Sequence, residues 1–365
     1  MARSWSINGR FLTQPLSGVQ RYGEEIVQAL DALLSEGHPL TRGLSLELLT
    51  PPVLTRPLPL AAIEMRRTGT SGGHTWEQLT LPRAPRGGLL SLANTGPVAA
   101  RKHIVCIHDV NTRIYPSSYS AQFRALYRVL LPALGRSAAR VATVSHYSAN
   151  QLSAFGIARR NKMAVIPNGH EHALRWSGRH SLNTEKAGGG NTILVIGSPA
   201  PHKNVRLLLE MADQLAAAGL RLAIVGMADP RVFSQNATVT EAPNVLWLGG
   251  LTDNEISALL DDCLCLAFPS FAEGFGLPAL EAMARGCPVV VSDRTSLPEI
   301  CGDAALYAAP TASAAWLAHF QRLKDDQGLR TGLIEKGHAQ ARRFRWRKSA
   351  ELYLKLMARV DGLEA

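Results

Sequence analysis

The chain has 365 residues, 46% of them hydrophobic, and a formal net charge of +10 at pH 7. That length is long for one hydrophobic core, so two domains are expected. No run of 18 apolar residues occurs and the first residues lack the apolar core of a signal peptide, so we expect neither a transmembrane helix nor export. The five cysteines follow no disulfide or metal-ligand spacing, which favours reduced thiols in the cytoplasm and no metal site.

The positive charge is concentrated in the first half. Residues 1–172 contain 19 Lys and Arg against 9 Asp and Glu, whereas residues 173–365 are balanced. A basic half can face anionic lipid, a lipid-linked pyrophosphate or nucleic acid, or it can reflect an arginine-rich proteome. A second basic cluster, residues 341–348, contains Phe344 and Trp346, which either pack against the body or lie at a membrane interface. Packing is favoured.

In the first half, apolar runs alternate with helically spaced segments. The pattern predicts strands at residues 5–8, 44–49, 89–92, 102–107, 140–144 and 163–166, and helices at 19–35, 119–134 and 145–155. Residues 51–88 are rich in Pro, Gly, Thr and Arg and predict loops with one short helix, and loops of this kind often carry binding specificity. Strands that alternate with helices predict a parallel sheet with right-handed crossovers.

A polar, glycine-rich stretch at residues 177–191 predicts a linker, and a second series follows it. Strands are predicted at residues 192–196, 221–225, 245–248, 264–268 and 288–292, and helices at 205–218, 253–261, 278–285, 312–325 and 346–363. Cys263 and Cys265 are expected on one face of the fourth of these strands. The chain is therefore predicted to be an α/β protein with two facing Rossmann-like domains and a ligand cleft between them. The glycine motifs of dinucleotide oxidoreductases and P-loop NTPases are absent.

The turn after residues 192–196 has the sequence GSPAPHKN and opens a helix. Such a turn directs backbone N–H groups toward the carboxyl end of the sheet, where an anion binds. Lys203 is then a candidate to neutralise the charge of a bound diphosphate. The alternative is that Lys203 and His202 are ordinary solvated side chains at a helix start.

The most informative stretch is residues 269–301, PSFAEGFGLPALEAMARGCPVVVSDRTSLPEIC. Its glycines and Pro278 predict a loop followed by a helix start, which Gly286 and Pro288 end. Glu273 then lies just before the helix N-terminus and Glu281 about one turn inside the helix. Two acids beside an anion-binding helix start favour a site for a phosphorylated, hydroxyl-rich molecule.

This segment resembles the signature of the retaining glycosyltransferases of family 4, which transfer sugars from nucleotide donors on a GT-B fold of two Rossmann-like domains. The resemblance implies that Glu273 contacts the donor sugar and Glu281 the ribose. The donor-binding residues that it implies in this half are Ser198, His202, Gly250, Leu251, Gly274, Phe275, Gly276 and Leu277. It also implies an acceptor-binding domain at residues 1–172, a linker at 173–191, a donor-binding domain at 192–345, and a final helix at 346–365 that crosses back to the first domain.

The resemblance extends to two places in the first half. For His108, at the end of the strand HIVCI, the resemblance implies a contact with the donor sugar. For Gly18 it implies a close approach of the backbone to the donor. Ser17 stands where relatives commonly have a second glycine, and Ser198 where they carry an arginine. His108, Glu273 and Lys203 are therefore the predicted catalytic residues.

The resemblance implies transfer with retention at the anomeric carbon by a front-face mechanism that needs no metal. It is strongest to bacterial polysaccharide-assembly members, which implies GDP-mannose as the favoured donor, no further cofactor, and a glycan or lipid-diphosphate acceptor in O-antigen or exopolysaccharide synthesis. The expected location is the cytoplasm, with peripheral contact to an anionic membrane and no nucleic-acid partner. The alternatives are a nucleotide-sugar epimerase or hydrolase of the same fold and a non-catalytic basic binding protein, which has no use for Glu273.

Overall fold

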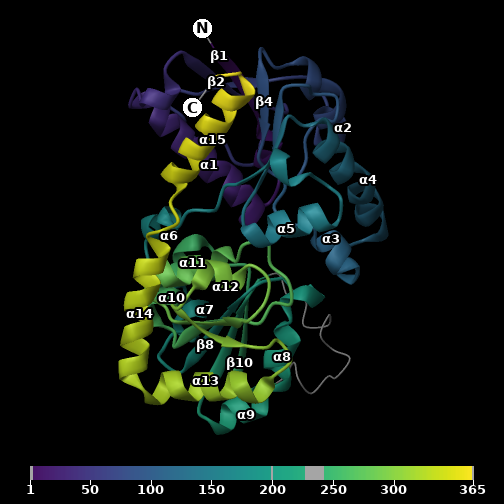
Figure 1. Ribbon diagram of the computed structural model, residues 1–365. Helices are drawn as coiled ribbons and strands as arrows, with labels where there is room; N and C mark the ends of the chain where they lie inside the picture. The colour runs from purple at the N-terminus through teal and green to yellow at the C-terminus, as the bar shows by residue number, and fades with distance from the viewer. Residues whose placement is uncertain (1–2, 199, 227–241, 364–365) are drawn as a thin grey trace. The chain divides into compact units, whose positions relative to one another are not determined.

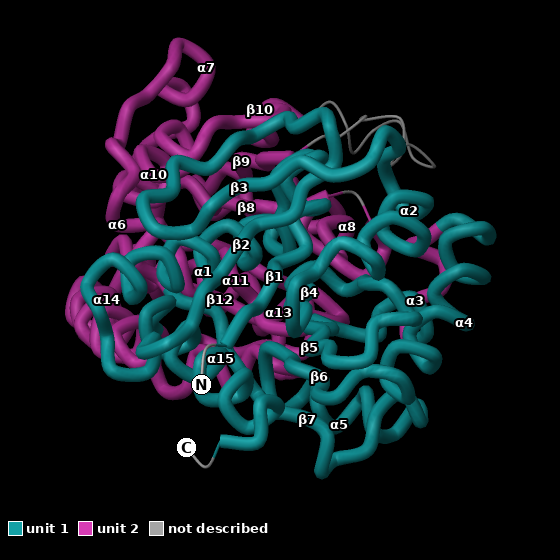
Figure 2. Tube along the Cα trace, turned by 90° about the horizontal axis from the view of Figure 1, so that it is seen from above, with its two compact units in different colours: residues 1–113, 120–169, 345–365 teal, residues 114–119, 170–344 magenta. Residues whose placement is uncertain are grey.

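The computed structural model describes residues 3–198, 200–226 and 242–363 (Figure 1). The chain forms two compact units (Figure 2). Unit 1 contains Met1–Arg113, Ser120–Gly169 and Arg345–Ala365, and unit 2 contains Ile114–Tyr119 and His170–Phe344. Each unit therefore includes a segment that is distant in sequence from its main part.

Unit 1 is built on a seven-stranded, fully parallel sheet with the order β3-β2-β1-β4-β5-β6-β7. Its strands are β1 (Arg3–Asn8), β2 (Leu44–Thr50), β3 (Glu64–Arg67), β4 (Gly88–Ser91), β5 (His103–Cys106), β6 (Arg140–Thr143) and β7 (Met163–Val165). Six of these strands lie where the apolar runs predicted them. The strand order reverses between β1 and β4, which is the position where ligands bind in open α/β sheets.

Strand β3 lies within the stretch expected to be loops. Its sequence, EMRR, has no apolar run because it is an edge strand that is largely exposed. Polar contacts hold it instead: Arg66 donates to both carboxylate oxygens of Glu47 on β2, at 2.9 and 3.0 Å. The Asp31 carboxylate accepts the N–H groups of residues 61–63 just before the strand, at 2.8–2.9 Å. Hydrophobic periodicity cannot detect a strand of this kind.

The helices of unit 1 are α1 (Gly18–Ser35), α2 (Gly73–Thr75), α3 (Asn111–Ile114, whose last residue falls in unit 2), α4 (Ala121–Ser137), α5 (His146–Ala154) and α15 (Trp346–Val360). Figure 1 shows α15 beside α1. The hydroxyl oxygens of Tyr22 on α1 and Tyr353 on α15 are 2.9 Å apart. The Tyr22 ring also meets the Trp346 ring edge to face, with ring centroids 5.7 Å apart. The two aromatic residues of the basic cluster at 341–348 pack within the protein. Trp346 is only 3% exposed, and the Phe344 ring meets that of Phe275 edge to face, with ring centroids 5.7 Å apart.

Unit 2 is built on a six-stranded parallel sheet with the order β10-β9-β8-β11-β12-β13. Its strands are β8 (Thr192–Ile196), β9 (Arg221–Val225), β10 (Val245–Gly249), β11 (Cys265–Phe268), β12 (Val289–Ser292) and β13 (Ala305–Ala308). Its helices are α6 (Glu171–Arg175), α7 (Leu182–Glu185), α8 (Val205–Glu210), α9 (Ala212–Ala217), α10 (Asp253–Asp262), α11 (Leu277–Ala284), α12 (Leu297–Cys301), α13 (Ser313–Asp325) and α14 (Gln327–Ala341). The elements β13, α12 and α14 were not expected; α14 contains three glycines, which weaken a helical signal.

Two further details differ from the sequence-based expectation. Residues 173–191, expected to be a linker, belong to unit 2, where Ser181 and Thr184 form a capping box for α7 and Arg221 binds the carbonyls of Lys186 and Gly188. Cys263 does not share a strand with Cys265, because Cys263 ends α10 and its Sγ lies 3.4 Å from that of Cys287. All five cysteines are free and buried. Among the described residues, no helix is both long and apolar enough to cross a membrane.

Candidate active site

The turn after β8 is fixed by one asparagine. Asn204 adopts a left-handed conformation, with φ of 54°, and its side-chain amide donates to the carbonyls of Pro269 (3.1 Å) and Pro310 (2.7 Å). The turn is thereby attached to the chain that leaves β11. Because β8 and β11 are neighbours in the sheet, residues that follow both strands come together at one edge. The helix expected at 205–218 is divided at Met211 into α8 and α9.

At this edge, two predicted catalytic residues meet. The Nζ of Lys203 lies 2.7 Å from Oε1 and 3.0 Å from Oε2 of Glu273, with side chains 22% and 10% exposed. The loop that carries Glu273 is held by Ser296, whose hydroxyl donates to the carbonyls of Glu273 (3.0 Å) and Phe275 (2.9 Å). The structure therefore brings a cation and a carboxylate together in a fixed, half-buried pair.

The glycine-flanked loop leads directly into α11. Gly276 has a φ of 102°, and a Cβ there would lie 2.6 Å from the Leu297 side chain, so only glycine fits. Phe275 and Leu277 are buried, at 5% and 6% exposure, and Phe275 packs on Phe344. These side chains shape the loop, while Gly274 and Gly276 bring the chain to the amino end of α11, which is the positive end of the helix dipole.

The second glutamate has a partner that the sequence did not predict. Oε1 of Glu281 lies 2.8 Å from Nε2 of His172, whose side chain is 1% exposed and meets Trp176 edge to face at 5.4 Å. His172 is 109 residues from Glu281. It follows the Pro167-Asn168-Gly169 turn by three positions, and no spacing rule connects it to the glutamate. The contact fixes one carboxylate oxygen of Glu281 and the ring orientation of His172.

His202 is enclosed by a segment from the first half of the sequence. Its Nδ1 lies 2.9 Å from the hydroxyl of Ser118, and its ring stacks on Tyr119 with centroids 6.1 Å apart. Burial, assisted by the charge of Lys203, lowers the pKa of His202 to about 4. His202 is therefore neutral near pH 7, and its side chain contributes a hydrogen bond and stacking rather than charge.

Three further predicted donor-binding residues follow the strands β8 and β10. Ser198 is exposed, in the turn after β8. Gly250 is exposed and Leu251 half-buried, just after β10 at the edge of the sheet. Three strand spacings separate β10 from β11, about 14 Å, a distance that only an extended ligand spans.

The predicted residues of unit 1 have their own surroundings. His108 follows β5, is 6% exposed, and its Nε2 lies 2.8 Å from the Leu92 carbonyl. Its ring meets that of Tyr22 edge to face at 4.8 Å. Burial by itself lowers the pKa of His108, but neighbouring Cys106 and the Leu92 carbonyl outweigh it, so the pKa lies above its ordinary value. Gly18 is the exposed first residue of α1. That His108 and Gly18 serve the donor stays a prediction.

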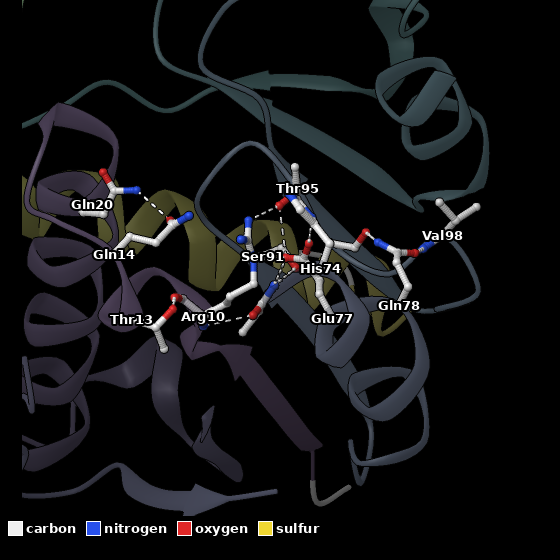
Figure 3. Close-up of polar contacts among 12 residues, drawn as sticks. Arg10, Thr13, Gln14, Gln20, His74, Glu77, Gln78, Ser91, Thr95 and Val98 are labelled. Carbon is white, nitrogen blue, oxygen red and sulfur yellow. Dashed lines mark hydrogen bonds and ion pairs between the residues drawn. The ribbon is translucent and has the colours of Figure 1, made fainter. Parts of the chain in front are cut away.

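A second polar cluster, which the sequence did not predict, lies where β1 and β4 end (Figure 3). Nε of Arg10 is 3.0 Å from Oε1 of Glu77, and both side chains are buried. Glu77 also accepts from Thr95 (3.0 Å), and its other oxygen lies 3.2 Å from Nδ1 of His74. Burial raises the pKa of Glu77, but His74 and Arg10 outweigh it and hold the pKa below its usual value. This charged network fills the strand-order reversal of unit 1.

Comparison with known proteins adds the family. Residues 180–340 match the family described as "Glycosyl transferases group 1". The matched region covers less than half of the chain. It contains Lys203, Glu273 and Glu281, and the match confirms the resemblance carried by the Glu273–Glu281 segment.

Curated relatives agree with this family match. The chain is 37% identical over 163 residues to the O-antigen chain mannosyltransferase B of Escherichia coli, and the match covers 42% of each chain. It is 26% identical over 226 residues to the O-antigen chain mannosyltransferase RfbU of Salmonella typhimurium, covering 61% of each. The matched region thus spans less than two thirds of these relatives' length.

Solved structures support the fold over the whole chain. The sucrose-phosphate synthase of Thermosynechococcus elongatus superposes with a TM-score of 0.72 at 16% identity, covering 99% of both chains. The expectation of two Rossmann-like, parallel-sheet domains of the GT-B class is confirmed.

Proposed function

We propose that this protein is a retaining, metal-independent glycosyltransferase that moves mannose from GDP-mannose to a glycan or lipid-diphosphate acceptor during bacterial O-antigen or exopolysaccharide assembly. The observation that carries the proposal is the Lys203–Glu273 pair, held beside the amino end of α11 inside the region that matches the group 1 glycosyl transferases. The names of the relatives, both O-antigen mannosyltransferases, support the choice of sugar and pathway.

Glycosyl transfer from a nucleotide requires stabilisation of two charges. The sugar becomes oxocarbenium-like, and the diphosphate leaves as an anion. Lys203 and the positive end of the α11 helix dipole would stabilise the diphosphate, since a fixed cation and a helix N-terminus both attract anions. Glu273 would hold the sugar hydroxyls, and Glu281, held through His172, would accept the ribose hydroxyls with its remaining oxygen.

The pairing of Lys203 with Glu273 gives each residue a second role. Glu273 would hold the Lys203 ammonium in position before the donor arrives, so that little reorganisation is needed when the diphosphate binds. In return, Lys203 would keep the Glu273 carboxylate directed toward the sugar. Preorganised charges of this kind lower the barrier because they need not be assembled during the reaction.

Donor identity is tested by thermal shift of the purified full chain with GDP-, UDP-, ADP- and dTDP-sugars. GDP-mannose should raise the melting temperature most, because a ligand that binds the native state stabilises it by mass action. Product analysis by NMR should then show the α-anomer that retention requires, with a rate unchanged by a metal chelator. Release of free mannose as the main product would favour the hydrolase alternative, and no shift with any sugar nucleotide would overturn the proposal.

A further inference from the structure

Helix α4 exposes apolar side chains in its first half. Phe123 is 36% exposed, Leu126 41% and Val129 71%, which places three large hydrophobic residues within seven positions on the surface. The buried residues of the helix, Leu130 and Leu134 among them, lie in its second half, whereas in the first half Phe123 stacks on Tyr127 with ring centroids 4.1 Å apart. Contiguous apolar surface in contact with water is unfavourable, and in a soluble domain such a patch marks an interaction site.

The same helix is basic. It carries Arg124, Arg128 and Arg136 and no Asp or Glu in 17 residues. Arg128 and Arg136 are exposed. Arg113, from α3, donates to the Arg128 carbonyl at 3.0 Å and adds a further positive charge beside the helix. A helix that combines exposed apolar residues with arginines and lacks acids has the composition of segments that lie in a membrane interface.

The other candidate for membrane contact in this chain is the basic cluster at residues 341–348, and it is not suited to that role. Its two aromatic residues are engaged within the protein, Trp346 against Tyr22 and Phe344 against Phe275. A membrane-binding segment needs exposed apolar side chains next to its charges, and among the described residues helix α4 provides them.

We propose that the α4 surface, consisting of Phe123, Leu126, Arg128, Val129 and Arg136, docks on an anionic lipid bilayer. Leu126 and Val129 lie three positions apart, on adjacent turns of one face, and would enter the boundary between headgroups and acyl chains. Arg128 and Arg136 would pair with lipid phosphates. Charge complementarity favours lipid over a protein partner, because residues 1–172 carry a net +10, which suits a uniformly anionic surface.

The test is sedimentation of the full chain with vesicles of phosphatidylcholine alone or mixed equally with phosphatidylglycerol. Binding should require phosphatidylglycerol and weaken in 0.5 M NaCl, because salt screens charge attraction. The double variant Leu126→Gln/Val129→Gln should lower the partition coefficient at least about tenfold. Arg128→Gln should lower it about fivefold, as expected for one basic residue at an anionic surface.

Matched controls come from the same unit. Val53 is 76% exposed and lies outside α4, so Val53→Gln should bind vesicles like the unchanged protein. Arg42→Gln, at another exposed position, removes the same charge as Arg128→Gln and should have a smaller effect. Circular dichroism and the thermal shift with GDP separate lost docking from lost folding or lost donor binding, so this proposal and the proposed transfer reaction can fail independently.

Three results would overturn the proposal. The protein could fail to bind vesicles that contain phosphatidylglycerol, it could bind both kinds of vesicle equally, or the Leu126→Gln/Val129→Gln variant could bind like the unchanged protein. Self-association in analytical ultracentrifugation that disappears in that variant would instead assign the α4 surface to a second copy of the chain.

Discussion

Lys203 contacts both carboxylate oxygens of Glu273, at 2.7 and 3.0 Å, although 70 residues separate them in sequence. The contact exists because β8 and β11 are adjacent parallel strands whose carboxyl ends open into the two loops. One loop is fixed by Asn204 and the other by Ser296. The two residues with the clearest roles in the proposed chemistry therefore form one electrostatic unit.

Coupling between these residues is the first prediction. Glu273→Gln and Lys203→Met should each lower mannose transfer at least about a hundredfold, because each removes a contact needed in the transition state. The double variant should lose far less than the product of the two single losses, since residues in direct contact act together. Steady-state kinetics of the unchanged protein, the two single variants and the double variant measure these losses. A loss in the double variant equal to the product of the two single losses would show that the pair is not a functional unit.

The second prediction concerns His172 as a positioning residue. His172→Ala should weaken GDP binding about tenfold, measured by calorimetry, because Glu281 loses the group that orients its carboxylate. His172→Gln, which keeps a hydrogen-bond donor, should recover part of the affinity. Equal affinities for all three proteins would show that the contact is only structural.

The third prediction is a stability effect at Gly276. Gly276→Ala should destabilise the protein by about 2–4 kcal/mol, because alanine disfavours positive φ and its Cβ would meet Leu297. Gly250→Ala is the matched control, since open space surrounds that position and its φ is not in the left-handed region. Urea unfolding distinguishes the two, and similar midpoints for both variants would contradict the conformation assigned to Gly276.

The fourth prediction is a loss of stability in mild acid. His103 on β5 is fully buried, and burial lowers its pKa to about 4 from an ordinary value near 6.5. Between these two pH values the unfolded chain binds a proton that the folded protein does not, so the free energy of unfolding falls as pH falls from about 6.5 to 4. The loss attributable to His103 at pH 4.5 should be about 2–3 kcal/mol.

Urea unfolding at pH 7 and pH 4.5 measures this loss. His103→Gln removes the titrating group and should show a smaller difference between the two pH values, even where its stability at pH 7 is lower. His202 shifts in the same direction, so part of the acid sensitivity should remain in the variant. An identical pH dependence in both proteins would contradict a neutral, buried His103.

Sequence patterns predicted the parts of this protein that depend on local signals. Alternating apolar strands and helices indicated two parallel sheets, and the residues around Glu273 and Glu281 indicated the family. The strand and the site contact that these patterns did not predict both depend on tertiary contacts. Strand β3 is held by the Arg66–Glu47 ion pair, and His172 meets Glu281 only after the chain has folded.

Mannose transfer by the purified full chain tests the central claim most directly. GDP-mannose with a labelled sugar is incubated with a lipid extract from polysaccharide-producing bacteria, and label in the lipid or glycan fraction is counted for the unchanged protein and for Glu273→Gln. The account predicts transfer by the unchanged protein and a loss of at least about a hundredfold in a folded Glu273→Gln variant. Equal transfer by both proteins would contradict it.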